Sequence, residues 1–142
     1  MSQPKNVAVE ATVLIVDDHA PMREAIGVCI KRSFPRLCVI EAPDGATALR
    51  HVEAHRPSLV LVDIILPDAN GLDLTRDIRK LSPATIVAAI SIDTSADMPA
   101  RAIAAGAADC IGKDKLFESL VPLVGAAVSV MNWMNTPESP SP

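Results

Sequence analysis

The chain has 142 residues, 49% of them apolar and only 2% aromatic, and its formal net charge is −4. This length fits one domain with one core, and the acidic balance and scarcity of aromatic rings argue against a protein that binds nucleic acids directly. Its three cysteines form no C-x-x-C pair, so we expect reduced thiols in a cytoplasmic protein rather than a disulfide framework or a zinc site.

Neither end of the chain predicts a membrane segment. Residues 1–10 have no cationic start followed by an apolar run, so we expect a flexible leader and not a signal peptide. The uncharged stretch 119–134 falls short of the ~20 apolar residues that a spanning helix needs, and Pro122, Gly125 and Asn132 interrupt it. We therefore expect an ordinary helix and no membrane partner, with a disordered tail over 135–142.

The first half of the chain predicts two strand–helix units. A strand is expected over 12–16 and a helix over 22–34, where apolar residues recur at helical spacing after Pro21. A second strand is expected over 38–40 and a second helix over 46–55, with the turn 43–45 between them.

The second half predicts three further units of the same kind. The strand over 59–62 is apolar throughout, which is typical of a parallel strand covered on both faces. A helix over 72–81 follows, before which Gly71 is expected to adopt a positive φ. A strand over 85–90, a helix over 99–105 that Gly106 ends, and a strand over 110–111 come next. The last helix is expected to follow Asp114, its predicted N-cap, and to end near residue 134.

Five strands alternating with five helices predict an α/β fold. Such an alternation gives a parallel sheet between two layers of helices, joined by right-handed crossovers. We expect it to form a single domain over 11–134.

Small polar side chains follow four of the five apolar runs. Asp17 and Asp18 follow the first run, Asp63 the third, Ser91 the fourth and Lys113 the fifth. Because ligands bind outside the carboxyl ends of the strands in open α/β folds, we expect these side chains to share one rim of the sheet. Two carboxylates ~4 Å apart repel by about 4 kcal/mol at an effective dielectric constant of ~20. The pattern therefore predicts a site for a divalent cation, of which Mg²⁺ suits carboxylates best, and for a phosphoryl group.

These motifs resemble those of the receiver domain of two-component response regulators. The resemblance covers roughly residues 11–131 and rests on Val16-Asp17-Asp18-His19, on Asp63-Ile64-Ile65-Leu66-Pro67 with Gly71 four residues later, on Ser91 and on Lys113. It is closest to receivers that often precede helix-turn-helix output domains. The resemblance implies a flavodoxin-like (βα)5 fold with a doubly wound parallel sheet in the strand order 2-1-3-4-5.

The resemblance also implies a phosphorylation-dependent signalling switch. Asp63 would accept a phosphoryl group from a sensor histidine kinase or a phosphotransfer protein, and Lys113 and Ser91 would contact its oxygens. The implied Mg²⁺ ligands are Asp17, Asp18, Asp63 and, through its backbone carbonyl, Ile65. Such a chain catalyses only its own phosphorylation and dephosphorylation, so we do not expect an enzyme that acts on an external substrate.

Three positions bear on how such a switch would work. Cys110 stands where receivers often carry a Tyr or Phe ring that moves on phosphorylation, so coupling through a ring is not expected. Ile65 cannot orient a water molecule for attack on the acyl phosphate, which predicts a long-lived phosphoryl group. The carboxylate of Asp93 could act in the opposite direction by holding water.

The last predicted helix is apolar around more of its surface than one buried stripe requires. Receivers often dimerise through the fourth helix, fifth strand and fifth helix. We therefore expect a homodimer or partner contact through the elements at 99–105 and 110–111 and the last helix. The alternative is that the far end of this helix simply covers the edge of the core.

Two other functions stay open at this point. One is a receiver-shaped protein-interaction module that is never phosphorylated. The other is a phosphohydrolase with an aspartyl-phosphate intermediate, but such enzymes typically place a second Asp two residues after the nucleophile, where this chain has Ile65.

Overall fold

The computed structural model describes residues 11–93 and 95–134. Its elements in chain order are β1 (Ala11–Val16), α1 (Ala20–Ser33), β2 (Leu37–Ala42), α2 (Gly45–His55), β3 (Leu59–Asp63), α3 (Gly71–Leu81), β4 (Ile86–Ser91), α4 (Met98–Ala105), β5 (Asp109–Gly112), the 3₁₀ turn η2 (Lys113–Lys115) and α5 (Leu116–Met134). All five predicted strands and five predicted helices are present, with ends mostly within two residues of the prediction. The predicted leader 1–10 and tail 135–142 lie outside the described residues.

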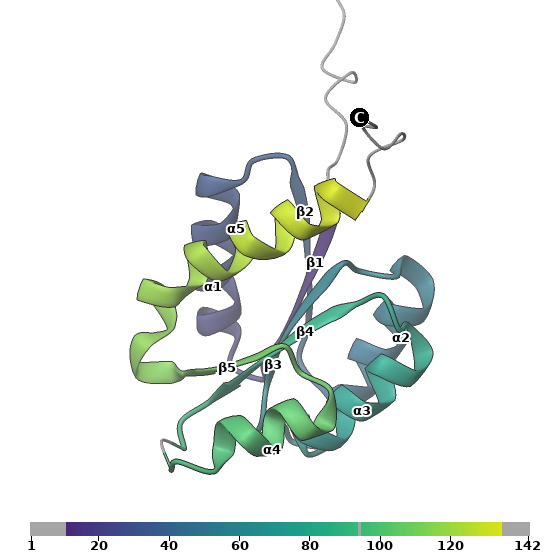
Figure 1. The fold of residues 1–142 in the computed structure, drawn as a ribbon, viewed down its shortest axis with the longest axis vertical. Coiled ribbons are helices and arrows are strands. Elements are labelled where there is room, and N and C mark those ends of the chain that lie inside the picture. The colour runs from purple at the N-terminus through teal and green to yellow at the C-terminus, as the bar shows by residue number, and fades with distance from the viewer. Residues whose placement is uncertain (1–10, 94, 135–142) are drawn as a thin grey trace, which may run out of the picture.

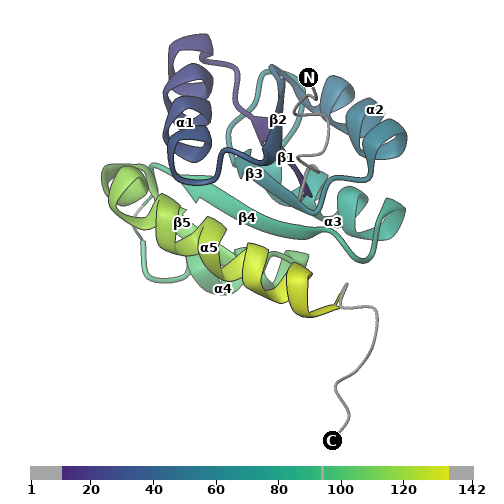
Figure 2. The ribbon, with the colours of Figure 1, turned by 90° about the horizontal axis from the view of Figure 1, so that it is seen from above.

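The strands form one parallel sheet in the order β2-β1-β3-β4-β5, as predicted. Helices α1 and α5 cover one face of this sheet, and α2, α3 and α4 cover the other (Figures 1 and 2). The fold is therefore the flavodoxin-like doubly wound arrangement, with β2 and β5 at the two edges. No helix within the described ranges is long and apolar enough to cross a membrane.

The three central strands are buried on both faces. In β1, Val13 and Ile15 pack beneath α1 and α5, while Leu14 and Val16 pack beneath α2 and its neighbours, and all four side chains are inaccessible to solvent. Each such side chain contributes roughly 1.5–3 kcal/mol by leaving water. This burial explains why the strands read as continuous apolar runs, and it leaves polar side chains only where the strands end.

Two local predictions are wrong. Gly71 does not adopt a positive φ, because among the described glycines only Gly106 does, with φ 111° at the end of α4. Asp114 is not the N-cap of α5, because the chain passes from Gly112 directly into η2, of which Asp114 is the second residue, and α5 begins at Leu116. Gly71 is the first residue of α3 and Asp114 lies within η2, so each follows soon after the end of a strand.

Candidate functional site

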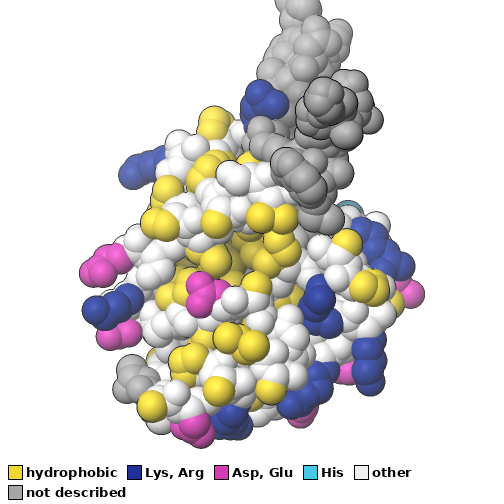
Figure 3. All heavy atoms as spheres, in the orientation of Figure 1, with side chains coloured by type: hydrophobic (Ala, Val, Ile, Leu, Met, Phe, Trp, Pro, Cys, Tyr) yellow, Lys and Arg dark blue, Asp and Glu magenta, His cyan; other side chains and the backbone are white. Residues whose placement is uncertain are grey.

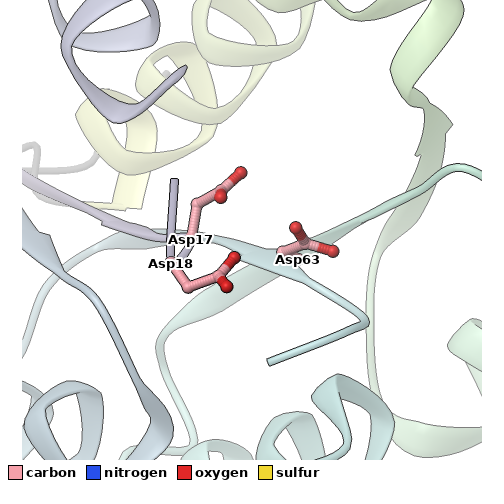
Figure 4. A group of neighbouring side chains, drawn as sticks. All are labelled: Asp17, Asp18 and Asp63. Carbon is pink, nitrogen blue, oxygen red and sulfur yellow. The ribbon is translucent and has the colours of Figure 1, made fainter. Parts of the chain in front are cut away.

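Three carboxylates meet at the carboxyl ends of β1 and β3. These strands are neighbours with Val16 opposite Val62, so Asp17 and Asp63 leave the sheet at the same level. One oxygen of each of Asp17, Asp18 and Asp63 lies within 4.8 Å of the others (Figure 4). Asp17 and Asp63 are buried, with 2% and 5% of their surface exposed, whereas Asp18 is exposed.

The carboxylate of Asp17 is buried among other acids and is only partly compensated. Its Oδ1 accepts a hydrogen bond of 2.8 Å from the backbone N–H of His19. Its buried Oδ2 has no hydrogen-bond partner among the described residues. Burial raises the pKa of Asp17, and the charges of Asp63 and Asp18 raise it further against the opposing effects of the His19 N–H and Lys113. A cation beside Asp17 would therefore stabilise the ionised form of its carboxylate.

Lys113 reaches the carboxylates from the end of β5. Its Nζ donates a hydrogen bond of 2.9 Å to Asp63 Oδ2 and lies 3.7 Å from Asp17 Oδ2. Partial burial alone would lower the pKa of Lys113, but the hydrogen bond and charge of Asp63, with the charge of Asp17, leave it above its ordinary value. The ammonium is therefore charged at neutral pH and neutralises part of the acidic cluster.

Asp63 is held from both sides. Besides the bond to Lys113, its Oδ1 accepts a hydrogen bond of 3.0 Å from the backbone N–H of Ile65. The loop after β3 then turns back tightly, with the Gly71 N–H donating to Ile64 O at 2.6 Å. A Cβ atom on Gly71 would lie 2.4 Å from Asp63 O, so only glycine permits this approach. This contact, and not a positive φ, explains the need for glycine.

Ser91 is at the expected rim, and its hydroxyl is hydrogen-bonded within the loop after β4. It ends β4, the strand beside β3, and is 3% exposed. Its Oγ accepts a hydrogen bond of 2.9 Å from the Asp93 N–H, so the hydroxyl serves its own loop. The Ile65 side chain, at 63% exposed, points to solvent next to the site. The roles of Ser91 and of the Ile65 carbonyl toward a ligand remain predictions.

Arg23 and Asp68 anchor the two loops that carry the acids, and the sequence analysis did not single them out. Arg23 Nη1 donates to Asp17 O at 2.6 Å, and both carboxylate oxygens of Asp68 accept from the first turn of α2. Asp68 stands in a Pro-Asp-Ala-Asn-Gly loop, where Asp is common for local reasons. Its partners are 22 and 23 residues away, so no local spacing marks it.

The residues of the cluster fit Mg²⁺. This ion takes oxygen ligands at about 2.1 Å and is usually bound by one or two carboxylates with waters and phosphate oxygens. Asp17, Asp18 and Asp63 supply such oxygens, and the unpartnered Asp17 Oδ2 is the atom that a cation would satisfy. The arrangement can thus hold a hard cation beside a nucleophilic carboxylate and an ammonium group.

Comparison with known proteins links the chain to one family. The response regulator receiver domain model matches residues 13–124. Protein-glutamate methylesterase/protein-glutamine glutaminase 1 of Caulobacter vibrioides is 36% identical over 102 residues, which are 71% of this chain and 30% of that protein. Transcriptional regulatory protein PdtaR of Mycobacterium tuberculosis is 31% identical over 126 residues, which are 87% of this chain and 60% of that protein.

Solved structures agree with this link. The crystal structure of a two-component response regulator of the LuxR family from Aurantimonas sp. SI85-9A1 superposes with a TM-score of 0.77 and 29% identity, covering 84% of this chain and 86% of that chain. Because the chain spans only 30% of the methylesterase and 60% of PdtaR, the activities of those whole proteins are not transferred to it.

Proposed function

The chain belongs to the receiver domain family of two-component response regulators, and from this premise we propose that it is a signalling switch phosphorylated on Asp63. The observation that carries the proposal is the group of three carboxylates within 4.8 Å, with the Lys113 ammonium 2.9 Å from Asp63. The proposed donor is a phosphohistidine on a sensor kinase or a phosphotransfer protein. The proposed location is the cytoplasm, and we expect no external substrate and no direct contact with nucleic acid.

In the proposed reaction an oxygen of Asp63 attacks the phosphorus of the donor in line with its P–N bond. An O–P bond forms, the P–N bond breaks, and the electron pair of that bond stays on the imidazole of the donor. Lys113 offers its ammonium to the incoming phosphoryl oxygens. Asp17 and Asp18, with Asp63 and the Ile65 carbonyl, would hold Mg²⁺, which neutralises negative charge during the transfer.

The proposed output surface is the face that carries α4, β5 and α5. Figure 3 shows hydrophobic side chains gathered over this face. Ile103 on α4 is 58% exposed and Val130 on α5 is 47% exposed. A groove of about 600 Å³ runs between β5 and α5, with Cys110, Leu123 and Ala126 among its lining residues. We propose that a second copy of the chain packs against this face when Asp63 is phosphorylated.

Labelling with a small phosphodonor tests the proposal. Wild-type protein incubated with phosphoramidate is expected to gain one phosphoryl group in the presence of Mg²⁺ and none in the presence of EDTA, as measured by intact-protein mass spectrometry. The variant Asp63→Asn is expected to gain none. The variant Asp73→Asn, at an exposed carboxylate on α3, is the matched control and should be labelled like wild type.

Two outcomes would refute the proposal. Labelling of Asp63→Asn at the wild-type level would show that another residue is the phosphoacceptor. Absence of labelling in folded wild-type protein, together with absence of Mg²⁺ binding, would favour an interaction module that is not phosphorylated.

A further inference from the structure

The connection between β2 and α2 carries none of the proposed metal ligands, yet it contacts both loops that do. We call the residues Glu41–Ala46 the β2–α2 segment. The loop after β1 joins it first through the backbone, because the Asp17 N–H donates to Ala42 O at 3.1 Å. Arg23 adds a second link, since its Nη1 donates to Asp17 O at 2.6 Å and its Nε to Glu41 Oε1 at 2.9 Å. The Arg23 side chain is largely buried, with 16% exposed.

The loop after β3 joins the same segment from the other side. Asp68 Oδ1 accepts a hydrogen bond of 2.8 Å from the Gly45 N–H, and Oδ2 accepts one of 3.1 Å from the Ala46 N–H. These amides open α2, and the N-cap residue Asp44 accepts from a different amide, the Thr47 N–H, at 2.8 Å, so Asp68 adds a second carboxylate there. An anion there is favoured because the first amides of a helix lack partners within the helix. A Cβ atom on Gly45 would lie 3.1 Å from Ala69 Cβ, so the two segments approach closely.

We propose that Arg23 and Asp68 are positioning residues for Mg²⁺, and that both act through the β2–α2 segment. Arg23 holds the loop with Asp17 and Asp18, and Asp68 holds the loop that starts at Asp63. The three carboxylates repel one another, so untethered loops would move apart, and Mg²⁺ tolerates little departure from octahedral geometry. Tethering both loops to one segment keeps their oxygens at the spacing that the ion needs.

The inference rests on the proposed function, because it concerns the same acidic site, but it is tested by Mg²⁺ binding without any phosphodonor. We expect Arg23→Gln and Asp68→Asn each to weaken Mg²⁺ binding, measured by isothermal titration calorimetry. The expected loss is about tenfold, which is typical when a residue that supports a metal ligand is changed. Asp68→Asn keeps one acceptor oxygen, so Asp68→Ala should lose more.

The matched controls are the same changes at an exposed ion pair. Arg76 and Asp73 on α3 pair with each other at 2.7 Å, with side chains 51% and 73% exposed. Arg76→Gln and Asp73→Asn should bind Mg²⁺ like wild type. The double variant Arg23→Gln/Asp68→Asn should lose less affinity than the product of the two single losses, because freeing either loop already removes the fixed spacing.

A purely structural role predicts different results. It would lower the free energy of unfolding in EDTA while leaving the Mg²⁺ dissociation constant of the folded protein unchanged, and that outcome in both single variants would overturn the inference. That outcome would leave the proposed function intact, because labelling of Asp63 in the wild-type protein would be unaffected by it. Absence of Mg²⁺ binding in wild type would instead refute the proposed function, and this inference with it.

Discussion

Asp17 carries a negative charge that the folded chain opposes when no cation is present. Its folded pKa is raised by burial and by neighbouring acids. When a group has a higher pKa in the folded than in the unfolded state, the free energy of unfolding is highest below the unfolded pKa. It falls as the pH rises through the folded pKa. At pH 7 the ionised group therefore destabilises the metal-free protein.

We accordingly expect Asp17→Asn to raise the free energy of unfolding at about pH 7 in EDTA by roughly 1–2 kcal/mol. The gain is smaller than the ~4 kcal/mol of an isolated like-charge pair at an effective dielectric constant of ~20, because Lys113 already neutralises part of the cluster. The gain should shrink as the pH falls through the folded pKa of Asp17. Urea denaturation at several pH values measures it, and a variant less stable than wild type at neutral pH would contradict the argument.

We expect Ile65 to influence how water reaches the proposed acyl phosphate. Its side chain is 63% exposed beside Asp63 and has no group that can orient water. Asp93 Oδ1 accepts a hydrogen bond of 2.8 Å from the Ser95 N–H, which lowers the pKa of Asp93, and a role of this carboxylate in holding water stays a prediction. The carboxylate is thus engaged within its own loop.

We expect Ile65→Asn to shorten the half-life of the phosphorylated protein by roughly tenfold, since an amide can hold the attacking water. The half-life is measured by following loss of the phosphoryl mass after removal of the donor. Ile65→Val is the control and should behave like wild type. An equal or longer half-life in Ile65→Asn would reject the role given to this position.

The element that would carry the signal away from the site is the connection from β4 to α4. Ser91 Oγ accepts a hydrogen bond from the Asp93 N–H, and Asp93 Oδ1 accepts one from the Ser95 N–H. The backbone at the start of this connection therefore depends on the position of the Ser91 hydroxyl. Cys110 on β5 lies opposite Ala89 of β4 and packs partly buried against the core. Its thiol is too small to replace a moving ring.

We therefore expect coupling through Ser91 without a contribution from Cys110. Beryllofluoride, a mimic of the phosphoryl group, should shift backbone amide resonances of α4 equally in wild type and Cys110→Ala. In Ser91→Ala the shifts should be strongly reduced. Loss of the shifts in Cys110→Ala would show that the thiol takes part.

Exposed apolar side chains on two helices allow the proposed dimer to be tested. Ile103 on α4 is 58% exposed on the proposed interface, and Val28 on α1, a helix outside the proposed interface elements α4, β5 and α5, is 54% exposed. With beryllofluoride and Mg²⁺, wild type and Val28→Glu should form dimers in analytical ultracentrifugation. Ile103→Glu should stay monomeric, because a buried unpaired charge costs several kcal/mol. Monomeric wild type at high concentration would refute the dimer.

At the scale of the molecule, the sequence predicted what depends on strand order and burial. Parallel strands buried on both faces can place polar groups only at their ends, so the rim positions of Asp17, Asp63, Ser91 and Lys113 followed from the apolar runs. The backbone conformation at Gly71 could not be predicted from the sequence, because glycine is needed there for the close approach of the backbone to Asp63 O. The tether by Asp68 joins residues more than 20 positions apart, so no spacing revealed it.

Binding of Mg²⁺ at the acidic site would link the ion to the stability of the whole domain. An ion that binds only the folded state raises the free energy of unfolding by about 2.7 kcal/mol at a concentration 100 times its dissociation constant. We expect urea denaturation of wild type to show this increase with MgCl₂. In Asp18→Asn the increase should be much smaller, because a ligand is lost.

General screening of the acidic cluster would give a similar trend, so NaCl at equal ionic strength is the control. Screening acts on any arrangement of charges, whereas coordination needs the three oxygens within 4.8 Å of one another. If NaCl stabilised wild type as much as MgCl₂, or if Asp18→Asn responded to MgCl₂ like wild type, the carboxylates would be a repulsive cluster and not a metal site. Stabilisation specific to Mg²⁺ and dependent on Asp18 would connect the geometry at the rim to the folding of the entire sheet.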